Sequence, residues 1–276
     1  MKTHRILAGV YILSILSLIS VNIYAAPKST LWDKWSQNSP KNSKTIDHSQ
    51  WSYFLNKYLV TNTPSGVNLV KYSSVTNIDK KKLGDYLTNL QEHKISDYNR
   101  NVQFAYWINL YNALTVKLII DHYPVSSITK IKSGWFSFGP WDMKIAKIEG
   151  SQLTLNDIEH RILRPIWKDN RIHYALNCAS ISCPNLQSVA YTSKNTNSLL
   201  NPAVKAYIDS PHGVNFKNGK LILSSIYDWY KIDFAKDNQG LLKYLADNAN
   251  KNLSDKLKNY KGSIQYDYNW NLNEYK

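Results

Sequence analysis

The chain has 276 residues, a hydrophobic content of 43% and a formal net charge of +14. This composition excludes a disordered chain, and two cysteines are too few for a disulfide scaffold, so the fold must depend on packing. The lysines are scattered, which fits either a solvated surface or attraction to an anionic cell-envelope surface, and no nucleic-acid partner is expected.

The N-terminus predicts an export signal. Lys2 and Arg5 precede an uncharged apolar run over residues 6–23, and the small residues Ala25 and Ala26 follow. This pattern is typical of a signal peptide over residues 1–26, although the run approaches the length of a membrane anchor. Cleavage would remove Lys2 and Arg5, lower the net charge from +14 to +12 and leave a periplasmic or secreted protein.

Residues 27–45 are rich in Ser, Asn, Lys and Pro, which predicts a flexible lead-in to a single domain over residues 46–276. Three apolar residues of this lead-in, Leu31, Trp32 and Trp35, are candidates for docking on the body. The segments 47–60 and 83–90 repeat apolar residues at helical spacing, so each predicts an amphipathic helix ahead of the rest of the domain.

The segment "NVQFAYWINLYNALTVKLIIDHYP" predicts the buried central helix, because it has no polar face wide enough for solvent. Pro124 ends it. Asn109 and Asn112 lie on its arc of small residues. Buried amides need hydrogen-bond partners, so these two side chains either clamp neighbouring backbone or face a polar pocket.

A hairpin is predicted over residues 143–153, turning at Glu149-Gly150. Thr154 and Asp157 then resemble a capping box that opens a helix over residues 155–167.

On a helical wheel Glu159 falls inside the apolar arc of this helix, at 40° from Leu155, while His160 and Arg164 project from the other side. A carboxylate on the core-facing arc needs a cation or several donors, so Glu159 is a candidate site residue.

The C-terminal part mixes helices and hairpins. Asn201-Pro202 predicts a helix start, "VNFKNGKLIL" predicts a hairpin turning at Asn218-Gly219, and residues 241–245 predict a further helix. Strict alternation over residues 264–270 predicts a half-buried strand. Helices combined with strands that are linked mainly by hairpins indicate the α+β class.

Both cysteines lie in "RIHYALNCASISCPNL", residues 171–186. Read as a strand, its first seven residues place His173 and Asn177 on one face beside a small residue, which leaves room for a ligand. Pro184 suits the first turn of a helix, so Cys183 would occupy the N-cap, where the dipole favours a thiolate.

A Cys-His hydrolase is one hypothesis for this segment, with Cys183 or Cys178 as nucleophile, His173 as base and Glu159 orienting the imidazole. Backbone amides of residues 179–183, or the side chains of Asn109, Asn112 or Asn177, could donate to a developing oxyanion.

Three alternatives stay open. The first is a structural disulfide between Cys178 and Cys183, which an oxidising compartment favours. Thiol redox chemistry would use the same pair at a looser spacing than usual. Zinc binding through Cys178, Cys183, His173 and His160 has no recognised ligand spacing, so no metal or other cofactor is expected.

Six separated blocks of the sequence resemble the family of domain of unknown function 547. They are "FAYWINLYNALT", "YPVSSI", "LTLNDIEHRILRP", "RIHYALNCASISCPNL", "YDWYKIDF" and "YDYNWNLN", and they cover most of Val102 to Leu272. The family's characteristic polar positions map onto Asn109, Asn112, Glu159, His160, Arg164, His173, Cys178 and Cys183.

The resemblance implies a fold similar to papain-like and transglutaminase-like cysteine enzymes, with the buried central helix packed on a mainly antiparallel sheet. The order of the thiol and histidine differs from the common papain-like one, which a permuted site or a lost activity would explain. We therefore expect an exported hydrolase or acyl transferase acting on an amide or thioester, with His160 and Arg164 among the groups that bind substrate or oxyanion. Its rival is a non-enzymatic binding or scaffold module with a structural Cys178–Cys183 disulfide.

Overall fold

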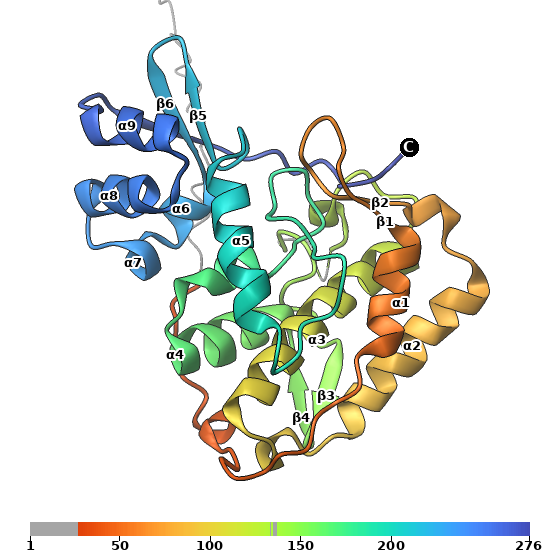
Figure 1. The fold of residues 1–276 in the computed structure, drawn as a ribbon. Coiled ribbons are helices and arrows are strands. Elements are labelled where there is room, and N and C mark those ends of the chain that lie inside the picture. Colours follow the sequence, from red (N-terminus) through yellow and green to blue (C-terminus); the bar gives the residue numbers. More distant parts are fainter. Residues whose placement is uncertain (1–26, 133, 135–136) are drawn as a thin grey trace, which may run out of the picture.

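The computed structural model describes residues 27–132, 134 and 137–276 (Figure 1). It contains 49% helix and 11% strand, which confirms the α+β class. The predicted signal peptide lies outside the described residues. Within those residues, no helix is both long enough and apolar enough to cross a bilayer.

Three helices build the N-terminal half: α1 (Ser49–Tyr58), α2 (Asn77–Glu92) and α3 (Arg100–Asp121). The predicted periodicity of each is confirmed by the burial of its apolar positions. Side chains cap two of them, because Thr76 accepts a hydrogen bond from the backbone of α2 and Asn99 accepts two from that of α3. A two-stranded antiparallel ribbon, β1 (Leu59–Val60) and β2 (Leu69–Val70), connects α1 to α2.

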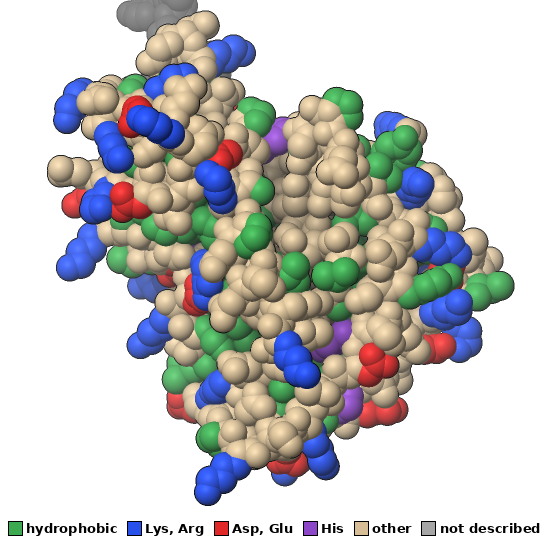
Figure 2. Space-filling model, viewed as in Figure 1, with side chains coloured by type: hydrophobic (Ala, Val, Ile, Leu, Met, Phe, Trp, Pro, Cys, Tyr) green, Lys and Arg blue, Asp and Glu red, His purple; other side chains and the backbone are tan. Residues whose placement is uncertain are grey.

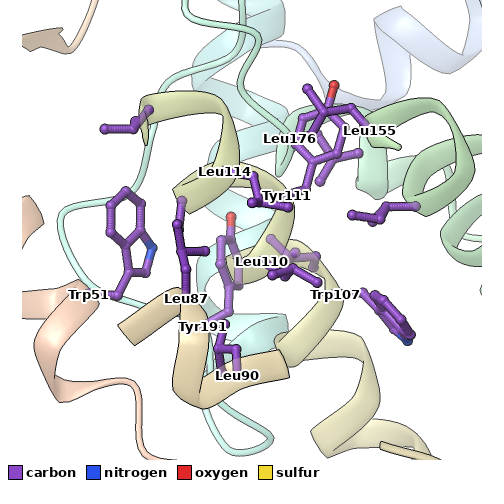
Figure 3. Packing of buried hydrophobic residues seen from close by; sticks show 14 of the residues in the cluster. Trp51, Leu87, Leu90, Trp107, Leu110, Tyr111, Leu114, Leu155, Leu176 and Tyr191 are labelled. Atoms are coloured by element: carbon purple, nitrogen blue, oxygen red, sulfur yellow. The ribbon is translucent and has the colours of Figure 1, made fainter. Parts of the chain in front are cut away.

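Helix α3 is buried along nearly its whole length, as predicted. Figure 3 shows side chains of α1 and α2, including Trp51 and Leu87, packed with Leu110 and Leu114 of α3. The expected packing of α3 on a sheet is wrong. Its main neighbours are α2 and the helical segment η5 (Asp157–Leu163), so other helices provide the burial that an all-round apolar helix needs.

The strands instead form three small sheets. One is the ribbon β1–β2, the second is the hairpin of β3 (Ala146–Ile148) and β4 (Ser151–Leu153), and the third has the order β5–β6–β7. The strands of the third sheet are β5 (Val214–Lys217), β6 (Lys220–Ser224) and β7 (Ile264–Asp267). All pairs are antiparallel except β6–β7, which is parallel.

Both predicted hairpin turns are confirmed, because the second residue of each is a glycine in the left-handed region, Gly150 at φ 79° and Gly219 at φ 74°. The capping box is also confirmed: the Asp157 amide donates to Thr154 Oγ1 at 3.0 Å, and the Thr154 amide donates to Asp157 Oδ2 at 3.1 Å. The helix that follows differs from the expected regular α-helix. Residues 157–163 form a π-helix that continues into α4 (Arg164–Trp167).

Five α-helices follow α4: α5 (Thr196–Ile208), α6 (Ile226–Trp229), α7 (Lys231–Phe234), α8 (Asn238–Asn248) and α9 (Lys251–Asn259). Helix α5 begins before the predicted start, so Pro202 lies inside it. The predicted last strand stops at Asp267 and does not reach Trp270.

The buried apolar residues form two clusters. The larger cluster is built around α3, and the smaller one joins α5, α8, α9 and the third sheet. Figure 1 shows α7, α8, α9, β5 and β6 on one side of the molecule and α1 and α2 on the other. Segments that connect these halves therefore meet at the junction of the two clusters.

Residues 27–45, expected to be flexible, are held on the body at several points. The Thr30 amide donates to the carbonyl of His160 at 3.0 Å, and the Trp32 amide donates to that of Arg161 at 3.0 Å. Trp35 is buried, with its ring edge-on to Trp107. This segment therefore lies against the helix that carries His160.

The basic charge is distributed over the surface. Figure 2 shows Lys and Arg side chains spread over the visible face with Asp and Glu among them. Many form helical ion pairs, such as Lys251 with Asp255 at 2.8 Å. Such pairs suit a solvated surface, and attraction to an anionic envelope stays a prediction.

Candidate functional site

A cavity opens at the junction of the two clusters and brings the candidate residues together. Its polar lining residues are Glu159, His160, His173, Cys178 and Cys183, together with Asn156. The other residues that line it are mostly aromatic or aliphatic: Pro27, Tyr111, Phe138, Trp141, Leu176, Ile226, Trp229, Tyr230, Tyr268 and Trp270. The predicted convergence of the acid, the imidazole and the sulfur on one pocket is therefore seen.

The local structure around His173 differs from the predicted strand. Residues Asn170–Tyr174 form a 3-10 helix, whose start is capped by the Asp169 side chain accepting from the Arg171 amide at 2.9 Å. The backbone is therefore helical here, whereas the alternation of side-chain types predicted an extended strand. His173 is consequently buried and reaches the cavity from a helical turn.

Cys178 and Cys183 lie on a tight loop, with their sulfur atoms 2.7 Å apart and not joined by a disulfide. The Cys183 Sγ accepts a hydrogen bond from the Cys178 amide at 2.8 Å. The expected helix N-cap at Cys183 is wrong, because the next helix begins only at Thr196. Local hydrogen bonds, rather than a helix dipole, therefore set the properties of the thiols.

The two thiols have opposite environments. Burial alone would raise the pKa of the half-buried Cys178, but hydrogen bonds outweigh burial and hold this pKa below its ordinary value. The hydrogen-bond partners of the Cys178 sulfur are Cys183, Ser180 at 3.2 Å and Tyr268 at 3.0 Å. Burial raises the pKa of Cys183 well above its ordinary value, and the contact with Cys178 raises it further. Cys178 is therefore the thiol that more readily becomes a thiolate.

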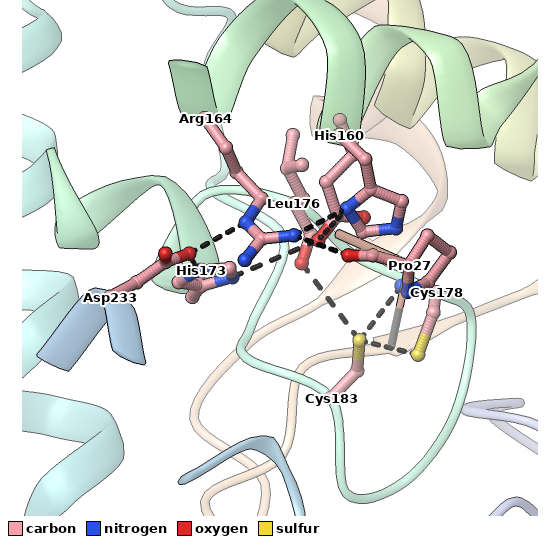
Figure 4. A network of polar contacts seen from close by, with 9 residues as sticks. Pro27, His160, Arg164, His173, Leu176, Cys178, Cys183 and Asp233 are labelled. Carbon is pink, nitrogen blue, oxygen red and sulfur yellow. Dashed lines mark hydrogen bonds and ion pairs between the residues drawn. The ribbon is translucent and has the colours of Figure 1, made fainter. Parts of the chain in front are cut away.

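His173 is held by carboxylates on both sides. Its Nε2 lies 2.7 Å from Asp233 Oδ2, and its Nδ1 lies 3.7 Å from Glu159 Oε1 (Figure 4). The ring also stacks on Tyr230, with centroids 4.1 Å apart. In the described part of the chain, no hydrogen bond or ion pair joins His173 to either sulfur, so the expected thiol–imidazole pair is not formed by this histidine.

Asp233 is a site residue that sequence reasoning missed. Burial alone would raise its pKa, but hydrogen bonds from His173 and Arg164 lower that pKa well below its ordinary value. Arg164 donates through Nε to Asp233 Oδ2 at 2.6 Å. Asp233 lies in the segment "YDWYKIDF", 69 residues from Arg164, and no local spacing connects the two.

Arg164 also fixes His160. The Arg164 guanidinium, which is buried, donates to His160 Nδ1 at 3.0 Å and to the Pro27 carbonyl at 2.9 Å. Burial lowers the pKa of His160, and the raising effect of Glu159 does not offset this, so the ring is neutral at pH 7. Because Nδ1 accepts a hydrogen bond, Nε2 carries the proton. The expected outward projection of His160 and Arg164 is therefore wrong, since both are buried.

The three asparagines proposed as oxyanion donors are committed elsewhere. The amide nitrogen of Asn109 donates to the Tyr191 carbonyl at 2.8 Å, that of Asn112 to Ala175 at 2.9 Å and that of Asn177 to Pro184 at 2.7 Å. The structural interpretation of Asn109 and Asn112, as clamps on neighbouring backbone, is confirmed.

The backbone amides of the cysteine loop are also largely committed. Those of residues 179, 181, 182 and 183 each donate within the protein. The ring of His160 lines the cavity, so its Nε2–H is a candidate donor for a developing negative charge.

No group of three or more His, Cys, Asp or Glu side chains in the described part of the chain is arranged to hold a metal ion. A low-pKa thiol, a neutral imidazole and a buried carboxylate–imidazole network thus define an α+β protein with a cysteine–histidine pocket.

Residues 95–208 match the family described as protein of unknown function, DUF547, which supports the resemblance noted from the sequence. The matched segment contains Glu159, His160, His173 and both cysteines, whereas Asp233 and Tyr268 lie beyond it. The chain matches no curated protein and no solved structure.

Proposed function

We propose that this protein is a cysteine-dependent acyl transferase or hydrolase, and that Cys178 is its nucleophile. The observation that carries the proposal is a half-buried thiol, Cys178, in contact with Cys183, Ser180 and Tyr268 inside a cavity that also contains His160. A thiolate is the nucleophilic form of cysteine, so hydrogen bonds to Cys178 supply an activated nucleophile without a separate base. The sequence hypothesis preferred Cys183, whose raised pKa argues against that role.

In the proposed reaction, the Cys178 thiolate attacks the acyl carbon and forms a carbon–sulfur bond while the carbonyl π electrons move to oxygen. The Nε2–H of His160 donates a hydrogen bond to this oxyanion. The oxyanion then collapses, the bond to the leaving group breaks, and an acyl-enzyme remains on Cys178. Water or another acceptor then attacks the acyl carbon and loses a proton to bulk solvent, and the carbon–sulfur bond breaks to release the Cys178 thiolate together with the hydrolysed or transferred acyl product.

The environment favours a thioester over an amide as the bond that is broken. A leaving thiolate needs no proton, whereas a leaving amine does. His160 is neutral, and both ring nitrogens of His173 face carboxylates. In this arrangement His173, Asp233 and Arg164 position His160 rather than transfer a proton to the leaving group.

Acylation by the thiobenzyl ester of N-acetylalanine, followed by mass spectrometry of the intact protein, tests this proposal. We expect an acetylalanyl adduct on Cys178 in the wild type and in Cys183→Ser, and none in Cys178→Ala. His160→Phe should slow acylation by roughly 100-fold or more, because an oxyanion donor is lost, and His160→Gln should restore part of the rate. His122→Gln, remote from the cavity, is the control. An adduct that persists in Cys178→Ala, or that maps to Cys183, would refute the assignment.

The second candidate is a non-enzymatic binding module whose two cysteines form a disulfide, and the 2.7 Å contact between the sulfurs favours it. Oxidation by a small disulfide would release two thiols as the Cys178–Cys183 bond forms. Counting free thiols in protein purified without reductant decides between the two. A disulfide that withstands millimolar reductant would exclude Cys178 as a nucleophile, whereas two free thiols would exclude the binding module with a structural disulfide.

Export is part of the proposal and depends on residues 1–26, which precede the described part of the chain. Fractionation of cells that express the full chain should recover it from the periplasm or medium with the leader removed. Washing of envelope fractions with increasing salt then tests attraction to an anionic surface, because such binding weakens as charges are screened.

A further inference from the structure

A wall of aromatic side chains extends from Cys178 along one side of the cavity. We call it the aromatic wall, and it consists of Tyr268, Trp270, Trp229, Trp141 and Phe138. Tyr268 contacts the Cys178 sulfur at 3.0 Å through its hydroxyl, and its ring lies 4.6 Å from that of Trp270. Trp270 in turn lies 5.6 Å from both Trp229 and Trp141. A group bound along these rings would reach the sulfur directly.

The backbone fixes this wall relative to the nucleophile. The Ile181 amide donates to the Asn271 carbonyl at 2.8 Å, and the Ser182 amide donates to that of Asn269 at 3.2 Å. The chain on both sides of Trp270 is thus hydrogen-bonded to the loop between the two cysteines. The distance from the rings to Cys178 is set by the fold and does not depend on a ligand.

The wall is accessible but not a solvated surface. Trp270, Trp229 and Tyr268 are each half-buried, and Trp141 is buried. Half-buried aromatic rings at a cavity still have apolar area to cover, which is typical of ligand pockets.

Charge along the cavity is sparse. Among the described residues that line it there is no Lys or Arg, and the carboxylate of Glu159 lies beside His173. An acidic or basic substituent would therefore lose its hydration at the wall without gaining a partner. A sugar ring could stack on Trp270, but its hydroxyls would need several polar partners, and Asn156 is already engaged with Asp142.

We propose that the aromatic wall is the acyl-binding subsite, and that it selects an uncharged aromatic or long aliphatic acyl group while directing its carbonyl to Cys178. This inference rests on the proposed function, because it names the substrate class of the same site. The exposed faces of the wall are flat rings, so a planar or extended apolar group can cover more of them than a compact one can.

Two measurements separate the subsite from the chemistry. In the first, 2-phenylacetamide, acetamide, phenylacetate and N-acetylglucosamine are titrated by ligand-observed NMR into Cys178→Ala, which cannot react. We expect binding of 2-phenylacetamide alone, and no binding after Trp270→Ala is added. Trp270→Phe, which keeps a ring, should retain most of the affinity and shows whether loss in Trp270→Ala reflects misfolding. Tyr53→Ala, an exposed tyrosine on α1, is the matched control.

The second measurement compares acylation of the wild type by phenylacetyl and acetyl thiobenzyl esters. We expect kcat/KM to be at least about 100-fold higher for the phenylacetyl ester, and this preference to fall about tenfold or more in Trp270→Ala. Binding of 2-phenylacetamide without any acylation would support the subsite and refute the proposed function. Acylation without a preference, or tighter binding of phenylacetate or N-acetylglucosamine, would overturn the subsite.

Discussion

The hydrogen bond between the two thiols gives the sharpest test of the site. When Cys178 is a thiolate it has no proton to donate, so the 2.7 Å contact between the sulfurs requires the Cys183 thiol to be the donor. A hydrogen bond to a charged group is worth about 1.5 to 3 kcal/mol, and one pKa unit corresponds to about 1.4 kcal/mol. Cys183→Ala should therefore raise the pKa of Cys178 by about 1 to 2 units. Cys183→Ser keeps a hydroxyl donor and should leave this pKa nearly unchanged.

The assay is the rate of Cys178 alkylation by iodoacetamide from pH 5.5 to 9.5, read by mass spectrometry. At pH values below the midpoints of both variants, the thiolate fraction should fall about 10- to 100-fold in Cys183→Ala relative to Cys183→Ser. A more basic thiolate is more nucleophilic, with a Brønsted slope of about 0.5, so the net rate should fall only about 3- to 10-fold. Equal midpoints in the two variants, both near the ordinary value of about 8.5, would refute the idea that Cys183 activates Cys178.

Three further predictions concern stability, each measured by urea unfolding. Asp233→Asn should lower the unfolding free energy by roughly 2 to 4 kcal/mol at pH 7, because the buried Arg164 loses its carboxylate partner. The pKa of Asp233 is lowered in the folded state, so the difference between the wild type and this variant should shrink as the pH falls below about 3.9. A difference that does not depend on pH would contradict the ion pair. Asn109→Ala should lower the unfolding free energy by about 2 to 5 kcal/mol, because it leaves the buried amide and carbonyl of Tyr191 without partners. The rate of Cys178 alkylation in the folded protein should stay unchanged. A slower alkylation would show that Asn109 contributes to the site of Cys178. Trp35→Ala should cost about 3 to 5 kcal/mol if residues 27–45 belong to the folded body, and a loss below about 1 kcal/mol would show that they do not.

The local features of the sequence predicted local structure well. The helical spacing of apolar residues located α1, α2 and the buried α3, and the glycine at the second position of each tight turn located both hairpins. Each of these depends on residues within a few positions of one another, where the chain geometry itself fixes the neighbours. The same reasoning failed for residues 171–177, since alternation cannot show that Asp169 caps a 3-10 turn.

By itself the sequence determined the helices of the N-terminal half, the α+β class and the set of polar residues at the candidate site. Only the tertiary structure decided how those residues are used. Glu159 and both histidines line one cavity. Asp233, 60 residues beyond His173 in the sequence, forms a hydrogen bond with the His173 imidazole, which was expected to act as the base for a thiol. Which buried polar groups pair is set by packing between distant segments, and the pKa of each thiol follows from those pairings.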